Sequence, residues 1–299
     1  MRLLLLSILV GALCAGLAAA GSPSRLQSGR CLDGGDRKTK LTLIEKLRRN
    51  PQILILGSSR GRTAEPSLLR RLTGRRAFNA AVKSGTAADA WVMVRFAADH
   101  FPPENRGYIW FIGNTIATKS VPSDLAADPR ARRYLDGNTH ARTSSCRLSS
   151  LYRADGSIAD VASGSPQDHA RRLAKAVARL VAHVNSHPPR PLTIDRAQVV
   201  YFERAIGFMN DHGSRPVIVL NPVHPRVLAA LERHGFPARK AARAYLKELH
   251  SRSDFVVVDC QDIRVWHGSA AHFVDATHVD QVNMRRMLKY VAAHSRGAL

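Results

Sequence analysis

The stretch Ile53-Leu54-Ile55-Leu56-Gly57-Ser58-Ser59-Arg60 is a run of four apolar residues that ends in a glycine and two serines. Consecutive apolar residues without polar alternation are typical of a strand buried on both faces, as in a parallel sheet. A serine directly after such a strand presents its hydroxyl at the carboxyl edge of the sheet, where reactive groups gather. The stretch therefore predicts a fold class and the position of a nucleophile. The alternative is that the serines only cap the following helix.

The rest of the chain alternates between the same kind of strand and amphipathic helices. Apolar runs predict strands at 76–82, 108–112, 216–220 and 255–258. Apolar periodicity and helix-start signals indicate helices at 41–49, 66–72, 87–100, 126–135, 167–187, 194–212, 227–231, 241–249 and 283–294. This alternation predicts an α/β fold with a central parallel sheet covered by helices on both faces.

The first 48 residues are expected to stand apart from this domain. Arg2 precedes the apolar segment Leu3–Ala20, which ends in small residues, so residues 1–20 are interpreted as a signal peptide. An uncleaved membrane anchor is the alternative, since the segment is nearly long enough to span a bilayer. Residues 21–48 are expected to form a linker and a short helix. Residues 49–299 form the main domain, with an insertion at about 115–165 that is typical of a lid or arm.

Charge and localisation limit the class of partner. The chain has 45 Lys and Arg against 23 Asp and Glu, a formal net charge of +22. Nucleic acid is disfavoured because the basic residues are spread along the chain, no recognition motif is present and export is expected. Attraction to an anionic cell-wall polymer fits better, and a merely solvated Arg-rich surface is the alternative. No second apolar run could span a membrane, so we expect a secreted or cell-envelope protein without a stable membrane span.

Cleavage of the leader would leave Cys31, Cys146 and Cys260. An oxidising compartment favours one disulfide and one buried free thiol. Cys31 and Cys146 lie in polar surroundings and are the favoured pair, whereas Cys260 ends an apolar run and fits the core. No cysteine or histidine spacing indicates a metal site, and no cofactor is expected.

Asp275-Ala276-Thr277-His278 lies just before the last predicted helix. This spacing lets the carboxylate accept a hydrogen bond from one imidazole nitrogen while the other nitrogen faces a serine hydroxyl. Asp275, His278 and a serine of the 57–60 turn are therefore candidates for a catalytic triad. The alternative is that Asp275 caps the last helix and His278 is an ordinary surface residue. Asp280 is expected to cap that helix, and Trp266 could line a pocket mouth.

The order and context of these motifs resemble the SGNH hydrolases, also called GDSL esterases, over about residues 50–298. Gly57-Ser58-Ser59 is similar to the first family block, Asn79 to Thr86 to the second, Gly113-Asn114-Thr115 to the third, and Asp275 with His278 to the last. The resemblance implies a flavodoxin-like three-layer α/β/α sandwich. It implies that Ser59 is the nucleophile and that Ser59, Gly85 and Asn114 form the oxyanion hole.

The chain also departs from the family pattern. Ser58 replaces the usual Asp, as in the GSS-type branch, Thr115 replaces another Asp, and the second block has one extra residue before its glycine. Ser58 would be the nucleophile if the alignment moved by one residue. Ser58, Asn221 and His224 are candidate pocket residues. Asn221 and His224 follow the fourth predicted strand, and the prolines around them favour a rigid turn over a pocket role.

The expected function is an exported serine esterase or O-acyltransferase. Its substrate would carry an ester-linked acyl group on a carbohydrate, a cell-wall component or a lipid, and the sequence does not identify which. A non-catalytic, basic cell-envelope binding protein that retains the SGNH fold is the alternative. A serine probe separates the two, because only the enzyme has an activated nucleophile.

Overall fold

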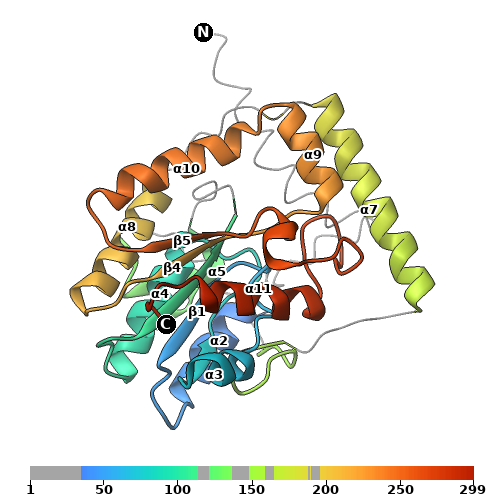
Figure 1. Ribbon diagram of the computed structural model, residues 1–299. Helices are drawn as coiled ribbons and strands as arrows, with labels where there is room; N and C mark the ends of the chain where they lie inside the picture. Colours follow the sequence, from blue (N-terminus) through green and yellow to red (C-terminus); the bar gives the residue numbers. More distant parts are fainter. Residues whose placement is uncertain (1–34, 114–120, 137–147, 159–164, 188, 190–195) are drawn as a thin grey trace.

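The structure is a computed structural model that describes residues 35–113, 121–136, 148–158, 165–187, 189 and 196–299 (Figure 1). The expected signal peptide, the Cys31–Cys146 pair and Asn114 lie outside the described residues. Within the described residues no helix has the length and apolarity required to cross a bilayer.

A five-stranded parallel sheet forms the centre of the molecule, in the order β2-β1-β3-β4-β5. The strands are β1 (Ile53–Gly57), β2 (Ala77–Asn79), β3 (Gly107–Ile112), β4 (Val217–Leu220) and β5 (Val256–Asp259). This strand order is that of flavodoxin-like proteins, in which the order reverses between β1 and β3 and ligands bind beyond the carboxyl ends of the strands. The predicted α/β class and the three-layer α/β/α sandwich are confirmed.

Helices cover both faces of the sheet (Figure 1). They are α2 (Asp36–Glu45), α3 (Pro66–Thr73), α4 (Ala87–His100), α5 (Ser123–Ala127), α6 (Pro129–Arg132), α7 (Pro166–Ser186), α8 (Arg196–Asp211), α9 (Pro225–Arg233), α10 (Pro237–His250), the 3-10 helix η1 (Ile263–Trp266) and α11 (Gln281–Ala293). One core cluster contains apolar residues of α2, α4 and α8, and the other contains residues of α3, α7, α9 and α11. Successive residues of β1 belong alternately to the two clusters, because their side chains point to opposite faces of the sheet. Both faces are buried, so the run from Ile53 to Leu56 has no polar position.

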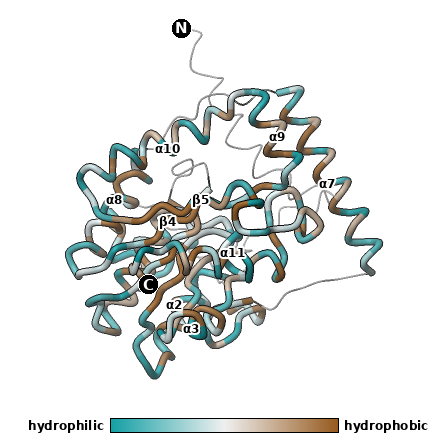
Figure 2. Tube along the Cα trace, in the orientation of Figure 1, coloured by the Kyte–Doolittle hydropathy of each residue, from teal (hydrophilic) through white to brown (hydrophobic). Residues whose placement is uncertain are grey.

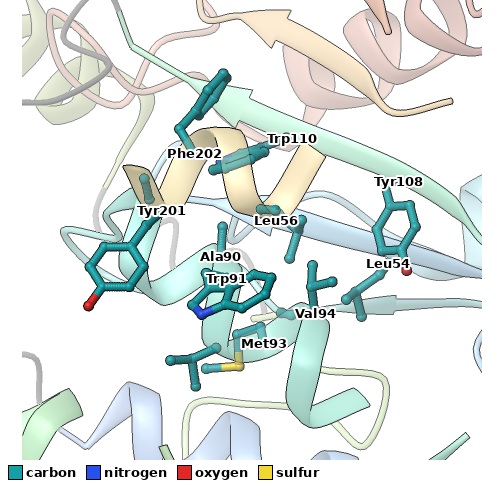
Figure 3. Packing of buried hydrophobic residues seen from close by; sticks show 14 of the residues in the cluster. Leu54, Leu56, Ala90, Trp91, Met93, Val94, Tyr108, Trp110, Tyr201 and Phe202 are labelled. Carbon is teal, nitrogen blue, oxygen red and sulfur yellow. The ribbon is translucent and has the colours of Figure 1, made fainter. Parts of the chain in front are cut away.

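Large side chains fill the space between the sheet and α4 and α8. Leu54, Leu56 and Trp110 from the sheet belong to the same cluster as Trp91 and its neighbours on α4 (Figure 3). The rings of Trp110 and Phe202 lie 4.5 Å apart between centroids. Figure 2 shows the hydrophobic strands β4 and β5 in the interior and hydrophilic residues along the outer sides of the helices.

The structure differs from the sequence-based expectation at the start of the described chain. The helix expected at 41–49 is α2, which begins five residues earlier, at Asp36, and ends at Glu45. Asp36, Arg37 and Lys40 are all less than 5% exposed. A charged segment was expected to be a solvated linker, but these charges have partners inside the protein, and the helix therefore extends through them.

The 115–165 region and Trp266 also differ from expectation. The described parts of this region pack into the domain: Leu125 and Ala131 are fully buried, and Ser149 donates its N–H to Thr39. The helix expected at 126–135 is broken into α5 and α6, because Pro129 disfavours helical geometry at the residue before it. Trp266 does not line a pocket mouth: it is 2% exposed and its indole N–H donates to the Cys260 carbonyl.

Candidate active site

The turn after β1 is shaped by Gly57, whose φ is +135°. A Cβ atom at this position would lie 2.4 Å from the Phe111 carbonyl oxygen on β3, so no larger residue fits. The Ser58 carbonyl accepts from Gly61 N–H at 2.9 Å, which bends the chain sharply at the carboxyl edge of the sheet. The Ser59 N–H donates to no acceptor within the described part of the chain.

The Gly-Ser-Ser sequence does not cap the next helix. The residue before α3 is Glu65, six positions after Ser59, and its side chain makes no capping hydrogen bond. The two serines are therefore placed by the turn alone, which leaves the Ser59 hydroxyl available for another partner.

Asp275 and His278 lie in a short loop that closes on itself. Val274 N–H donates to the His278 carbonyl at 2.7 Å, and Phe273 and Val279 form an isolated antiparallel bridge. One Asp275 oxygen accepts from the N–H groups of Thr277 at 2.7 Å and His278 at 2.9 Å. The other oxygen is 2.8 Å from His278 Nδ1. The carboxylate therefore fixes both the backbone of the loop and the orientation of the imidazole.

The loop brings His278 to Ser59. Ser59 Oγ lies 2.8 Å from His278 Nε2, although the two residues are 219 positions apart in the chain. With Nδ1–H donating to Asp275, the Nε2 lone pair is left to accept the serine proton. Ser59, His278 and Asp275 thus form a continuous hydrogen-bonded chain. Only Ser59 of the two adjacent serines has a hydrogen bond to His278, so Ser58 is not placed as the nucleophile.

The charge of Asp275 is fixed by its surroundings. Burial alone would raise the pKa of this carboxyl, but the hydrogen bond and charge of His278 and the N–H groups of Thr277 and His278 outweigh it. They lower the pKa of Asp275 from 3.8 to about 2. Asp275 is therefore an anion throughout the neutral range, as is required of a group that stabilises an imidazolium.

A second set of contacts ties the histidine loop to the serine turn. Asp280 caps α11 by accepting from Asn283 N–H at 3.0 Å, as expected, and its other oxygen is 2.7 Å from His272 Nδ1. Asp275 therefore does not serve as the cap of this helix. From the first turn of α11, Gln281 donates to the Thr63 carbonyl at 3.2 Å. These contacts hold the two halves of the site at a fixed separation.

Glu65 and Arg285 strengthen this connection between α3 and α11. The Arg285 guanidinium donates to the Glu65 carboxylate at 2.7 Å, and Glu65 is only 8% exposed. Burial alone would raise the pKa of Glu65, but the hydrogen bonds from Arg285 and Gln281 lower it below its usual value. Sequence reasoning missed this contact, because neither residue belongs to a motif and 220 positions separate them.

The second family block lies against the serine turn. The Asn79 amide donates to the carbonyls of Gly61 and Ala64 at 2.8 Å each, and its oxygen accepts from Ala81 N–H at 3.0 Å. A Cβ atom on Gly85 would lie 2.4 Å from the Gly57 carbonyl oxygen. The Gly85 N–H, expected to be an oxyanion donor, donates to the Val82 carbonyl at 3.2 Å. Gly85 is therefore beside the serine, with its amide held in a turn.

Asn221 and His224, the candidate pocket residues, are both buried. His224 N–H donates to the Ala276 carbonyl at 3.0 Å, and its ring lies edge-on to Phe273 at 5.4 Å. Burial and the nearby Arg226 lower the pKa of His224. Asn221 is 1% exposed, and its side-chain amide finds no hydrogen-bond partner among the residues that the structure describes. His224 therefore contacts the loop that carries Asp275 and His278, and it has no hydrogen bond to Ser59 among the described contacts.

Other described features do not compete with this site. Among the described residues, no group of three or more His, Cys, Asp or Glu side chains could hold a metal ion. A hollow of about 330 Å³ lies between α10 and β5, lined by Lys247, Phe255 and Val257 among others. It contains none of the candidate residues. Cys260 is a buried free thiol, as expected.

Comparison with known proteins gives no assignment of its own: no family model matches the chain, and no curated protein is significantly similar to it.

Proposed function

We propose that this protein is a serine esterase or O-acyltransferase that acts on ester-linked acyl groups. The observation that carries the proposal is the Ser59–His278–Asp275 chain, with hydrogen-bond distances of 2.8 Å at both steps. Residues so distant in sequence have no structural need to form this arrangement, and a serine hydroxyl requires such a base to become a nucleophile. The resemblance of the surrounding motifs to the SGNH hydrolases supports the same proposal.

The proposed reaction has two halves. His278 Nε2 takes the proton of Ser59 Oγ as the oxygen attacks the ester carbonyl carbon. Asp275 stabilises the resulting imidazolium. The tetrahedral oxyanion accepts a hydrogen bond from the Ser59 N–H and, as the resemblance implies, from Asn114. The resemblance also implies Gly85 as a donor, which requires its N–H to leave the Val82 carbonyl that it donates to in this structure. One such donor is typically worth about 3 kcal/mol.

Collapse of this intermediate breaks the bond to the alcohol oxygen, which receives the proton from His278. The acyl group is then bonded to Ser59. A water molecule or an acceptor hydroxyl gives its proton to His278 and attacks the carbonyl carbon of the acyl-enzyme. The bond to Ser59 Oγ then breaks, and His278 returns the proton to that oxygen. Water as acceptor makes the protein an esterase, and a sugar or lipid hydroxyl makes it an acyltransferase.

The proposed location of this activity is the cell envelope or the extracellular space. The apolar segment at residues 3–20 supports export, and the net charge of +22 supports attraction to an anionic cell-wall polymer near the substrate. The acyl-bearing substrate would be a carbohydrate, cell-wall or lipid ester.

The test is hydrolysis of a short-chain aryl ester by the wild-type protein and by Ser59→Ala. The proposal predicts that the variant loses turnover but unfolds at the same temperature as the wild type. Ser58→Ala is the matched control, because it removes the adjacent hydroxyl and keeps the Ser59–His278 contact. Full activity in Ser59→Ala would refute the proposal. An inactive wild type that binds anionic polymers in a salt-sensitive way would favour the non-catalytic binding protein instead.

A further inference from the structure

Three charged side chains of α2 point into the protein rather than into solvent. Asp36 and Lys40 are at most 1% exposed and Arg37 is 4% exposed. Burial of charges is costly unless each has a close partner. Two of their partners, Asn79 and Lys83, lie in the segment 79–86 that carries Gly85. The others include Arg62 of the serine turn, Asp89 at the start of α4, Asp124 and Gly156.

Asp36 bridges the two turns that enclose the nucleophile. Its Oδ2 atom accepts from the Lys83 N–H at 2.9 Å, two residues before Gly85. The same oxygen is 3.3 Å from Arg62 Nε, and Arg62 closes the turn that starts at Ser59. Asp36 is thus the common partner of the serine turn and of the segment that carries Gly85.

Arg37 holds the other end of the same segment. Its guanidinium donates to Asp89 at 2.6 Å and 3.1 Å through two nitrogens, a bidentate geometry that fixes the carboxylate. Asp89 in turn accepts from the Thr86 N–H at 2.8 Å in the capping box of α4. Arg37 therefore positions the residue directly after Gly85 through one intermediate side chain.

Lys40 holds the beginning of the segment. Its ammonium donates to the Asn79 carbonyl at 2.5 Å and also to the Gly156 carbonyl, and it lies 4.2 Å from the centre of the Tyr152 ring. Burial lowers the pKa of Lys40 well below its usual value, against the opposing effect of Asp36. Asn79 is the residue whose amide fixes the turn after Ser59, so Lys40 acts on both turns.

We propose that α2 is a clamp that sets the distance between the nucleophile and the oxyanion-binding segment 79–86, and that Asp36 is its principal positioning residue. This inference rests on the proposed function. Asp36 itself touches neither the substrate nor Ser59. Removal of the Asp36 carboxylate leaves the hydrogen bonds among Ser59, His278 and Asp275 intact, but it allows the segment 79–86 to move relative to Ser59.

The test compares Asp36→Asn and Asp36→Ala with the wild type in two independent measurements. The first is the rate at which a fluorophosphonate labels Ser59, together with kcat and KM for an aryl ester. The amide of Asp36→Asn keeps the shape of the side chain but loses the charge that attracts Arg62. We expect labelling and kcat to fall about tenfold in Asp36→Asn and about a hundredfold in Asp36→Ala, with KM unchanged, because a displacement near 1 Å costs on this order.

The second measurement is backbone hydrogen exchange, which needs no activity. Peptides covering 79–86 should exchange faster in both variants, and peptides covering 274–279 should not change. Glu45→Gln is the matched control: Glu45 is on the same helix but pairs with Arg130 at 2.8 Å, away from segment 79–86. It should label at the wild-type rate.

Wild-type labelling and exchange in Asp36→Asn would overturn the clamp, even if Asp36→Ala fails to fold. Failure of the proposed function is a different result. In that case the wild-type protein itself does not react with the fluorophosphonate. The hydrogen-exchange rates of residues 79–86 in the Asp36 variants, compared with the wild type, then test by themselves whether α2 positions this segment.

Discussion

Gly85→Ala is a one-carbon change whose effect can be worked out from the packing of the site. The added Cβ would lie 2.4 Å from the Gly57 carbonyl oxygen, 3.0 Å from the Gly57 carbonyl carbon and 3.2 Å from Ser58 Cα. These are backbone atoms at the end of the strand that precedes Ser59, so the clash cannot be relieved by the rotation of a side chain. The two segments must separate by about 1 Å to restore an ordinary contact.

Under the proposed function, a separation of this size moves the segment that carries Gly85 away from the carbonyl that Ser59 would attack. Misplacement by 1 Å typically costs about a hundredfold in rate. We therefore expect kcat for an aryl ester to fall about a hundredfold, with a smaller effect on KM. Overpacking at a fixed backbone contact costs about 1–3 kcal/mol, so the free energy of unfolding should fall by a similar amount.

Gly207→Ala is the matched control for this change. Gly207 lies in α8, and a Cβ atom there would meet nothing within 4 Å. Helix propensity predicts a gain of about 1 kcal/mol in stability with unchanged activity. The assay is steady-state hydrolysis combined with urea denaturation of both variants. Wild-type kcat in Gly85→Ala would refute the reasoning, because the clash could then be relieved without moving the wall of the site.

Four further predictions concern three single residues, Asp275, Glu65 and Cys260. Asp275→Asn should lower kcat by about 10⁴, since the amide disturbs the imidazole tautomer, and stopped-flow or steady-state kinetics measures this loss. Because the folded pKa of Asp275 is about 2 against 3.8 ordinarily, its carboxylate stabilises the fold above pH 4 and loses that effect as the pH falls towards 2. The side chain is 44% exposed, so the difference in stability between wild type and Asp275→Asn should be small and should shrink over this range. Glu65→Gln should lower the free energy of unfolding by about 1 kcal/mol in urea denaturation at pH 7, and an unchanged midpoint would contradict a role for the Arg285 pair. Burial raises the pKa of the Cys260 thiol, so this cysteine should resist alkylation by iodoacetamide in the native protein. Rapid alkylation of Cys260 in peptide mapping would contradict this, because it would show that the residue after β5 is accessible to solvent.

The sequence predicted the framework of the fold because its strands are continuous apolar runs. The helix at Ala87–His100 and the strand starting at Ile53 occur at the expected positions, since apolar periodicity and end signals agree there. The start of α2 could not be predicted in this way. Its first turn is Asp-Arg-Lys-Thr, a composition typical of solvent-exposed segments. Its burial is explained by partners that are distant in the chain, among them Arg62, Lys83 and Asp89.

The same contrast holds for the site. Ser59, Asp275 and His278 were identifiable because each lies in a short motif with a chemical reason for its spacing. Glu65, Asn283 and Asp36 were not, because they act through contacts with residues that are far away in the chain. Asn283, for example, is fully buried and donates to the carbonyls of Ser269 and His272, behind the histidine loop. The positions of supporting residues follow from tertiary packing rather than from any local pattern.

The most direct measurement of the central claim is mass spectrometry of the protein after reaction with a fluorophosphonate. An activated serine attacks phosphorus and displaces fluoride, which leaves a stable adduct on its oxygen. We expect a single adduct on the peptide that contains Ser59, its retention in Ser58→Ala and its loss in Ser59→Ala and His278→Ala. Absence of an adduct on the folded wild-type protein, or an adduct that persists in Ser59→Ala, would contradict the claim that Ser59 is a nucleophile activated by His278.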